Sequence, residues 1–249
     1  SAASDVYKRQ VYSFMDSAII GRSGSFTVKN YVYLFHSEDL RSMIFGTLIL
    51  AVVVAVISTI LGTLGAIGAF YSSKKLKRPI HLMNQIPVVN ADVVTGFSIC
   101  VLLIVFFKMD KASYIPLVIG LVSLCSPFVY LSVIPRLKQM DPQLYEAALD
   151  LGCSPFGALR KVVLPQLTSG IVSGFMMSIT LTLDDYFITT YTKPSMFDTI
   201  STYVVNATKG AQTDVKTALW ALSTIIFLIV IFVVIGMNHT GRKENDHEI

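Results

Sequence analysis

The chain has 249 residues, of which 53% are hydrophobic and 14% are charged, and its formal net charge is +4. Soluble domains have about a quarter charged residues, and several apolar runs in this sequence exceed the roughly 20 residues that span a bilayer. The composition excludes an ordinary soluble domain and predicts a polytopic membrane protein. Nucleic-acid binding is not indicated, because the Lys and Arg residues gather at the ends of the apolar runs.

The sequence holds none of the short motifs that identify common enzymes. It has no G-x-x-x-x-G-K-[S/T] phosphate loop, no H-E-x-x-H zinc motif and no G-x-S-x-G nucleophile motif. Its 3 Cys and 4 His residues show neither a disulfide framework nor metal-ligand spacing. We therefore expect a protein that is not an enzyme and that has no metal site, no cofactor and no ATP hydrolysis of its own.

Five apolar runs predict transmembrane helices, because backbone that crosses lipid singly must be helical. Lys and Arg follow the first run at 74–78 and the third run at 136–138, and they recur in the tail at 242–243. Cytoplasmic loops carry an excess of these residues, so these segments and the C-terminus are expected in the cytoplasm. The predicted spans are residues 43–71, 86–107, 114–134, 166–191 and 217–237.

The N-terminal residues 1–10 show no apolar period and no signal-peptide core. We interpret them as a non-native leader and residues 11–249 as a single transmembrane domain. Within the first span, Gly62, Gly65 and Gly68 recur every three residues, which predicts close contact with another helix.

A polar insert separates the third and fourth spans. Asp141 can cap a short helix there, and Gly152 can take the left-handed conformation that ends one. Ser154 and Pro155 repeat the start signal, and Pro165 is expected to stop the second helix. The insert is therefore predicted to be two short amphipathic helices, joined by a tight glycine turn, with a shape suited to docking on another protein.

The insert carries the pattern E-A-A-x3-G-x9-V-x-L-P. This pattern closely resembles the EAA loop of ABC importer permeases, the membrane subunits of binding-protein-dependent uptake systems. The resemblance implies a MetI-like, type I importer helix bundle, in which the loop at 136–165 couples the bundle to a cytoplasmic ATPase. The matching residues are Glu146, Ala147, Ala148, Gly152, Val162, Leu164 and Pro165.

The same resemblance implies partners and a location. It implies a dimer of cytoplasmic ABC ATPase subunits, a second permease subunit and an extracytoplasmic substrate-binding protein, in the bacterial plasma (inner) membrane. Glu146 is then expected to pair with a basic residue in a groove of the ATPase. In the family a first helix leads into a segment like 11–14, and we expect this chain to be a fragment without that helix.

Segments 87–96, 183–186 and 213–219 resemble the PotC-type branch of the spermidine/putrescine permeases. This resemblance implies a polyamine substrate. It covers nearly the whole chain but is weaker than the match at the insert, and Asp214 stands where that branch has proline.

Asp184, Asp185 and Tyr186 lie together in the fourth apolar run. A carboxylate deep in a bilayer costs at least about 2.5–3.5 kcal/mol, so it normally faces a cavity or a partner. Adjacent helical residues point about 100° apart, so one carboxylate can meet a cationic substrate while the other caps or pairs with a helix. The alternative is a structural hinge. Asp92 is interpreted chiefly as the start signal of a helix.

Three other functions are compatible with parts of the sequence. The same architecture could import ferric iron or another small cation. An intramembrane aspartyl enzyme could use Asp92 with Asp184 or Asp185, although the Gly-x-Gly-Asp signature of such enzymes is absent from both places. A passive channel would leave the two capped helices of the insert unexplained.

Overall fold

The computed structural model describes residues 38–72, 92–110, 112–141 and 143–209, together with the single helical positions 224, 228, 231 and 235. Every regular element in these residues is helical, in agreement with the predicted fold class. The proposed leader, the basic segment 74–78 and most of the predicted fifth span lie outside the described residues.

The described helices include two π-helical segments, η1 and η2. The elements are α3 (Glu38–Tyr71), α5 (Asp92–Cys100), η1 (Val101–Phe106), α6 (Ile115–Gln139), α7 (Gln143–Asp150), α8 (Pro155–Ala158), η2 (Leu159–Val163), α9 (Leu164–Gln166), α10 (Thr168–Asp184), α11 (Phe187–Thr192) and α12 (Ile200–Lys209).

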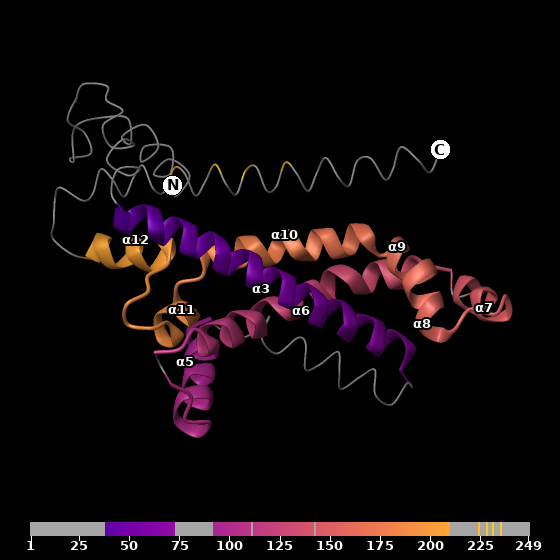
Figure 1. Cartoon of the computed structure of the whole chain (residues 1–249), viewed down its shortest axis with the longest axis horizontal. Coiled ribbons are helices and arrows are strands. Elements are labelled where there is room, and N and C mark those ends of the chain that lie inside the picture. The colour runs from indigo at the N-terminus through magenta and orange to yellow at the C-terminus, as the bar shows by residue number, and fades with distance from the viewer. Residues whose placement is uncertain are drawn as a thin grey trace.

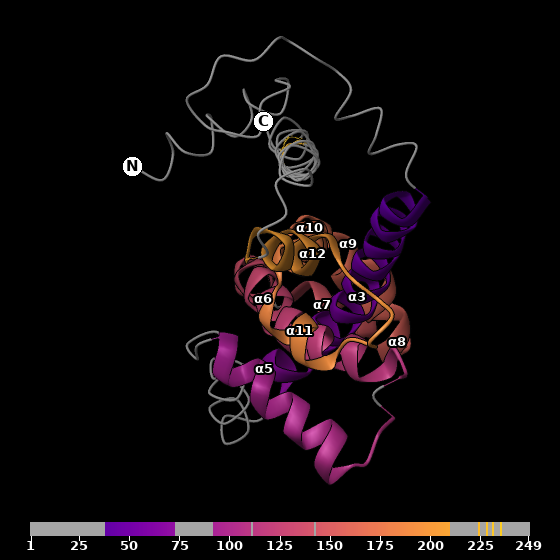
Figure 2. The ribbon, with the colours of Figure 1, turned by 90° about the vertical axis from the view of Figure 1, so that its left-hand side faces the viewer.

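Three long helices, α3, α6 and α10, pack side by side and form the body of the molecule (Figure 1). The short helices α7, α8 and α9 lie at one end of this body, and α11 and α12 lie at the other (Figure 1). Helix α5 projects away from the three long helices and packs mainly on α11 (Figure 2).

Two helices are long and apolar enough to cross a membrane alone, Leu40–Tyr71 and Ile115–Gln139. They correspond to the first and third predicted spans. A third candidate is the pair Pro155–Gln166 and Thr168–Asp184, which is bent by 71° at its break. The shorter apolar helix Val94–Phe106 occupies the described part of the second predicted span.

The buried side chain of Val129 in α6 lies between glycines of the two neighbouring long helices. A Cβ atom on Gly62 of α3 would lie 2.6 Å from the Val129 Cβ atom, and one on Gly174 of α10 would lie 3.0 Å from its Cγ1 atom. The glycines therefore let both helix backbones approach the same side chain. Close approach of this kind is the usual role of small residues between membrane helices.

The predicted glycine stripe is confirmed at one of its three positions. A Cβ atom on Gly65 would only just reach Tyr130, at 4.0 Å, and one on Gly68 would meet nothing within 4 Å. Each step of three residues turns the helix face by about 60°, so Gly68 is exposed, whereas Ala66 and Ala69 are buried in a core with Val133 of α6. Of the three glycines of the stripe, only Gly62 is required by packing.

The third predicted span is longer than expected. Helix α6 continues through Pro135 to Gln139, so the insert begins at Met140 instead of at position 136. Proline removes one backbone hydrogen bond of the helix, but the Met140 N–H still donates to the Arg136 carbonyl at 3.1 Å. Packing of the last turn, where Leu137 is fully buried, outweighs the missing bond.

The close contact at Gly62 predicts that even one added methyl group is destabilising. Gly62→Ala places its Cβ atom 2.6 Å from Val129 and 2.8 Å from the Ser126 carbonyl oxygen, and overpacking of this kind costs about 1–3 kcal/mol. Gly68→Ala is the matched control, because its methyl group enters open space and Ala favours a helix by roughly 0.5–1 kcal/mol. Thermal unfolding of both purified variants in detergent should show a lower midpoint for Gly62→Ala alone.

Candidate functional site

The first helix of the insert, α7, begins at a side-chain cap. The Asp141 carboxylate accepts a hydrogen bond from the Gln143 N–H at 2.9 Å. The backbone carbonyl of Asp141 accepts one from the Leu144 N–H at 3.2 Å. This is the cap that the sequence predicts. Beyond it, Glu146 and Ala147 are exposed, whereas Ala148 is buried.

Helix α7 ends at Asp150, and the turn that follows it is closed by Gly152, whose φ of +84° is in the left-handed region. The Gly152 N–H donates to the Leu149 carbonyl at 2.9 Å, and the Cys153 N–H donates to the Ala148 carbonyl at 3.0 Å. These two bonds form a Schellman motif, which satisfies the last carbonyl groups of a helix. The predicted glycine turn is therefore present, and its backbone requires a residue that tolerates positive φ.

The second helical stretch starts at Ser154, whose hydroxyl oxygen accepts from the Gly157 N–H at 3.2 Å. It continues through α8, η2 and α9. The expectation that Pro165 stops this stretch was wrong, because the stretch ends at Gln166. The wide π-helical turn before Pro165, in which the Leu164 N–H bonds to the Leu159 carbonyl, gives room for the proline ring.

The sharp change of direction follows at Leu167, between α9 and α10. There the Thr168 hydroxyl donates to the Pro165 carbonyl at 2.7 Å, so this backbone oxygen is satisfied at the bend. The insert is therefore joined to α10 by a bent but continuously hydrogen-bonded chain.

The insert buries one side and exposes the other. Val163 is fully buried in a core with Val133, Leu137 and Leu167, and Leu159 packs against the same cluster. We call the outward side the docking tip and define it by the exposed residues Leu144, Glu146, Asp150, Leu151 and Phe156.

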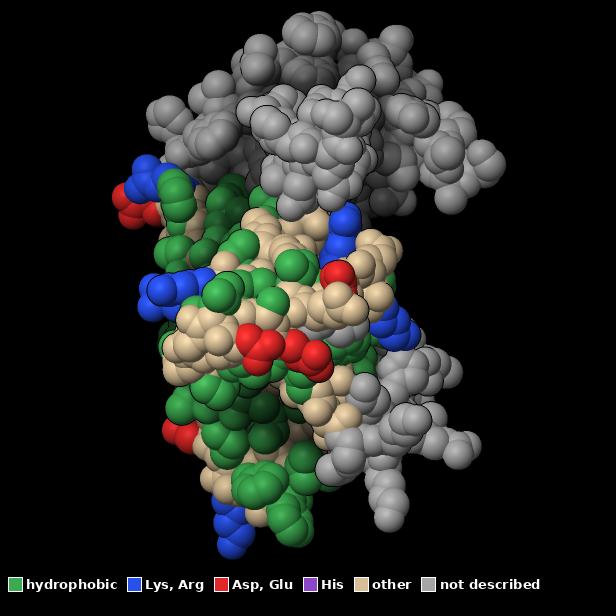
Figure 3. Space-filling view, turned by 90° about the vertical axis from the view of Figure 1, so that its right-hand side faces the viewer, with side chains coloured by type: hydrophobic (Ala, Val, Ile, Leu, Met, Phe, Trp, Pro, Cys, Tyr) green, Lys and Arg blue, Asp and Glu red, His purple; other side chains and the backbone are tan. Residues whose placement is uncertain are grey.

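Large apolar side chains of the docking tip remain in solvent. Leu151 is 87% exposed, Phe156 is 74% exposed and Leu144 is 42% exposed. Acidic side chains gather on the face at this end of the molecule, with Lys and Arg side chains toward its sides (Figure 3). Exposed apolar groups with a charged rim are typical of a protein interaction surface.

A second candidate site lies at the opposite end of the bundle, where the predicted fourth span is broken. Helix α10 ends at Asp184, Asp185 has an extended backbone with ψ 125°, and α11 begins at Phe187. The continuous span predicted for 166–191 was therefore wrong. An aspartate can offer its carboxylate to nearby N–H groups in competition with the helical pattern, and this is what Asp185 does.

The carboxylate of Asp185 is turned inward and bonded to α11. Its Oδ2 atom accepts from both the N–H and the hydroxyl group of Thr189, each at 2.8 Å. Its Oδ1 atom lies 3.4 Å from the Ile188 N–H. Asp185 thus caps the first turn of α11, where the positive end of the helix dipole also favours a carboxylate.

Asp184 and Tyr186 face a different environment. Asp184 is exposed, and its backbone carbonyl accepts from the Ser201 hydroxyl at 3.3 Å. The Tyr186 hydroxyl donates to the Asn206 side-chain oxygen at 3.4 Å. Ser201 and Asn206 both belong to α12, so this helix covers the break. Sequence reasoning missed both residues, because each lies far along the chain from the aspartates and belongs to no motif.

Helix α11 packs between α5 and α6 at Ile188, whose side chain is fully buried. A Cβ atom on Gly96 of α5 would lie 3.1 Å from the Ile188 Cα atom, and one on Gly120 of α6 would lie 2.8 Å from its Cγ2 atom. The Cys100 thiol also donates to the Tyr191 carbonyl at 3.2 Å. Helix α11, which follows the α10–α11 break, is therefore held against both α5 and α6.

Two further expectations concern acidic residues and metals. Helix α5 begins at Asp92, as expected for a start signal, although the Asp92 side chain is outside the described set. Among the residues that the structure describes, no group of three or more His, Cys, Asp or Glu side chains could hold a metal ion.

The cap predicts different effects for the two neighbouring aspartates. Asp185→Ala leaves two backbone N–H groups and one hydroxyl group without their acceptor, and loss of a helix cap costs about 0.5–2 kcal/mol. Asp184→Ala is the matched control, because no hydrogen bond to its carboxylate is found in the described part of the chain. Thermal unfolding should give a lower midpoint for Asp185→Ala only; equal midpoints for the two variants would contradict the capping role.

Comparison with known proteins agrees with this geometry. Residues 58–241 match the family described as "Binding-protein-dependent transport system inner membrane component". The spermidine/putrescine transport system permease protein PotC of Escherichia coli K12 is 28% identical over 221 residues, 88% of this chain and 81% of that protein. The putrescine permease protein PotI of the same strain is 28% identical over 229 residues, 87% of this chain and 78% of that protein.

The fold is also similar to a solved transporter structure. A chain of a bacterial alginate ABC transporter, crystallised in complex with an alginate pentasaccharide-bound periplasmic protein, superposes with a TM-score of 0.67. The identity is 18%, and the match covers 88% of this chain and 83% of that one. The chain therefore belongs to the binding-protein-dependent transport system inner membrane components, and it is a multi-pass permease subunit of an ABC importer.

Proposed function

We propose that this permease imports polyamines, with spermidine and putrescine as the expected substrates. The names of the relatives PotC and PotI support this substrate class, and each match covers more than three quarters of both chains. The likeness to an alginate transporter supports the fold alone, because its identity is 18%. Ferric iron or another small cation has no comparable support among these relatives.

In this proposal the insert receives force from a dimer of ATPase subunits in the cytoplasm. The main support for the coupling role is the glycine turn at Gly152. This turn is closed by backbone hydrogen bonds, and it leaves the side chains of Leu151 and Phe156 exposed at the end of the insert. Burying such a side chain in a partner's groove is worth about 1.5–3 kcal/mol. Glu146 and Asp150 would meet basic groups around that groove.

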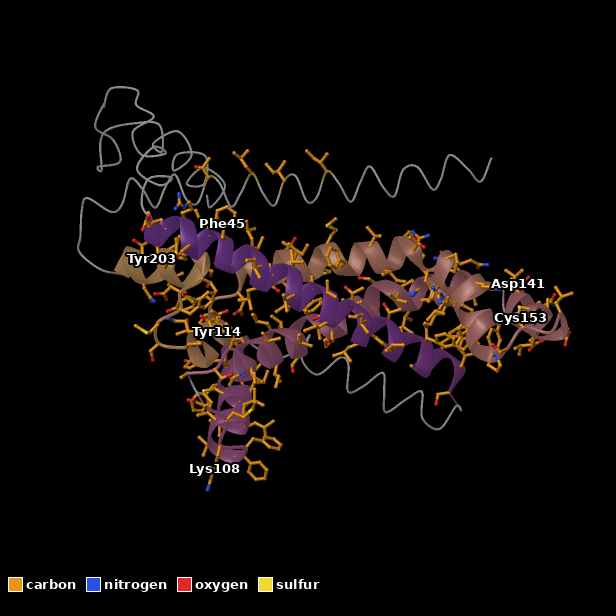
Figure 4. The ribbon with its side chains drawn as sticks, viewed as in Figure 1. Phe45, Lys108, Tyr114, Asp141, Cys153 and Tyr203 are labelled. Atoms are coloured by element: carbon orange, nitrogen blue, oxygen red, sulfur yellow. The ribbon has the colours of Figure 1, made fainter. Side chains whose placement is uncertain are left out.

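The other partners are a second permease subunit and an extracytoplasmic binding protein. The description of the matching family, a binding-protein-dependent transport system, supports a binding protein on the outer face. With the insert and the C-terminus in the cytoplasm, the α10–α11 break would lie toward the outer face. Figure 4 shows Asp141 and Cys153 of the insert at the end opposite Tyr114 and Tyr203.

At the break, Asp184 is the residue that we assign to the substrate pathway. Asp185 was an equal candidate in the sequence, but its carboxylate already accepts bonds from α11. Tyr186 lies beside Asp184 and can offer a ring face to an ammonium group, an attraction of about 0.5–2 kcal/mol. One carboxylate and one aromatic ring suit the amino groups of a polyamine.

The test of the proposed function is ATP-dependent uptake of labelled spermidine and putrescine. The full-length protein is co-expressed with its ATPase, its partner permease and its binding protein, and uptake is measured in membrane vesicles. Uptake that stops when ATP is depleted is the expected result. Uptake of ferric iron or another cation in place of polyamines would overturn the substrate class and leave the importer role in place.

The positive φ of Gly152 predicts a loss of coupling in Gly152→Val. A left-handed backbone costs a residue with a Cβ atom about 1–2 kcal/mol, and a β-branched side chain resists it further. We expect vesicles with this variant to insert the permease normally and to lose most of their ATP-dependent uptake. Gly152→Asn is the matched control, because Asn tolerates this conformation. Full uptake by Gly152→Val would argue against the coupling turn.

The exposure of Asp184 predicts a charge-dependent effect on uptake. A hydrogen bond to a charged group is worth about 1.5–3 kcal/mol, so Asp184→Asn should raise the apparent KM for spermidine by roughly ten- to a hundredfold. Asp184→Glu keeps the charge and should retain much of the uptake. If both variants transport spermidine like the unchanged protein, Asp184 does not contribute to the pathway.

A further inference from the structure

We propose that a contact between Tyr145 of α7 and Tyr71 of α3 transmits movement of the insert to the first long helix of the bundle. This inference rests on the proposed coupling function of the insert. Helix α3 has no direct chain connection to the insert. The two tyrosine side chains would let α3 follow movements of the ATPase subunits.

The chain connects the insert directly to only two of the three long helices. Helix α6 leads into α7 through Met140 and Asp141, and α9 leads into α10 through Leu167. Helix α3 is followed in sequence by 73–91 and α5, so it is reached from the insert only by packing. Movement of α3 with the insert therefore depends on side-chain contacts.

The two tyrosine rings meet at the end of the bundle where the insert lies. Their ring centroids are 4.9 Å apart, and the ring planes are inclined by 44°. The Tyr71 ring in turn contacts the Phe70 ring edge-on, with centroids 5.2 Å apart. Both distances lie in the range in which aromatic rings attract each other. The contact therefore extends from α7 into the last turn of α3.

Tyr145 is also the α7 side chain that packs on the buried core of the bundle. That core includes Ala66 and Ala69 of α3 and Leu137 of α6. The α7 backbone itself packs mainly against α8 and η2. A long, rigid ring with few rotatable bonds is suited to bridge from such a helix to α3.

The position of Tyr145 next to the docking tip supports the assignment. Its neighbours Leu144 and Glu146 are exposed, whereas Tyr145 is partly buried. Successive residues of a helix point about 100° apart, so one short helix presents Glu146 to a partner and Tyr145 to α3. A push on the outer side of α7 then reaches Tyr71 without a change within the helix.

The experiment uses the complete importer in proteoliposomes and measures spermidine uptake and ATP hydrolysis in the same samples. In Tyr145→Ala we expect the amount of spermidine transported per ATP to fall by about fivefold or more, while the ATPase subunits remain bound. Tyr145→Phe keeps the ring and should behave like the unchanged protein. Tyr71→Ala combined with Tyr145→Ala should be no worse than either single variant, because both remove the same contact.

Phe106→Ala is the matched control. It removes a ring pair with a similar centroid distance, 5.4 Å, but with ring planes inclined by 81°, at the C-terminal end of η1. Lys108, two residues further on, lies far from Asp141 and Cys153 of the insert (Figure 4). The transport per ATP of Phe106→Ala should be unchanged. If Tyr145→Ala does not assemble, Tyr145→Leu keeps apolar bulk without the ring and is expected to show the same fall.

Two results would overturn the inference in distinguishable ways. An unchanged ratio of transport to hydrolysis in the assembled Tyr145 variants, or additive losses in the double variant, would overturn the tyrosine contact alone. Absence of ATP-dependent spermidine uptake by the unchanged complex would overturn the proposed function and the tyrosine contact together.

Discussion

The contact of Val129 with two glycines is the constraint on which the rest of the bundle depends. Because Gly62 of α3 and Gly174 of α10 lack side chains, both helices can lie close to the Val129 side chain of α6. Interiors are close-packed, and neighbouring groups give way very little. The three long helices therefore meet as a tightly packed unit at this level. The insert lies at one end of that unit and the α10–α11 break lies at the other (Figure 1).

The sequence predicts those features of the structure that depend on residues close together in the chain. The cap at Asp141 and the left-handed turn at Gly152 depend on a few bonds within one turn of chain. The long apolar runs that form α3 and α6 are recognisable because lipid demands both length and apolar composition. Such features were predicted at the correct positions, although α6 extends further than expected.

The features that the sequence does not predict depend on contacts between distant residues. Asp184 and Asp185 are chemically identical neighbours, but the Asp185 carboxylate is buried and accepts bonds from Thr189, whereas Asp184 is exposed. Of the three regularly spaced glycines Gly62, Gly65 and Gly68 in α3, only Gly62 faces a close neighbour, which depends on how α3 is rotated against α6. The pairing of Tyr71 with Tyr145 joins residues with no common motif. Each of these required the packed structure.

The capped break has a consequence for how long a cationic substrate would remain bound. Two free carboxylates side by side would hold a multiply charged amine tightly, and a transporter must also release its cargo. At this break the charge of Asp185 is already opposed by the N-terminal dipole and the N–H groups of α11. In the proposed pathway, only the charge of Asp184 would remain to attract the amine, which would favour a short dwell time and rapid passage.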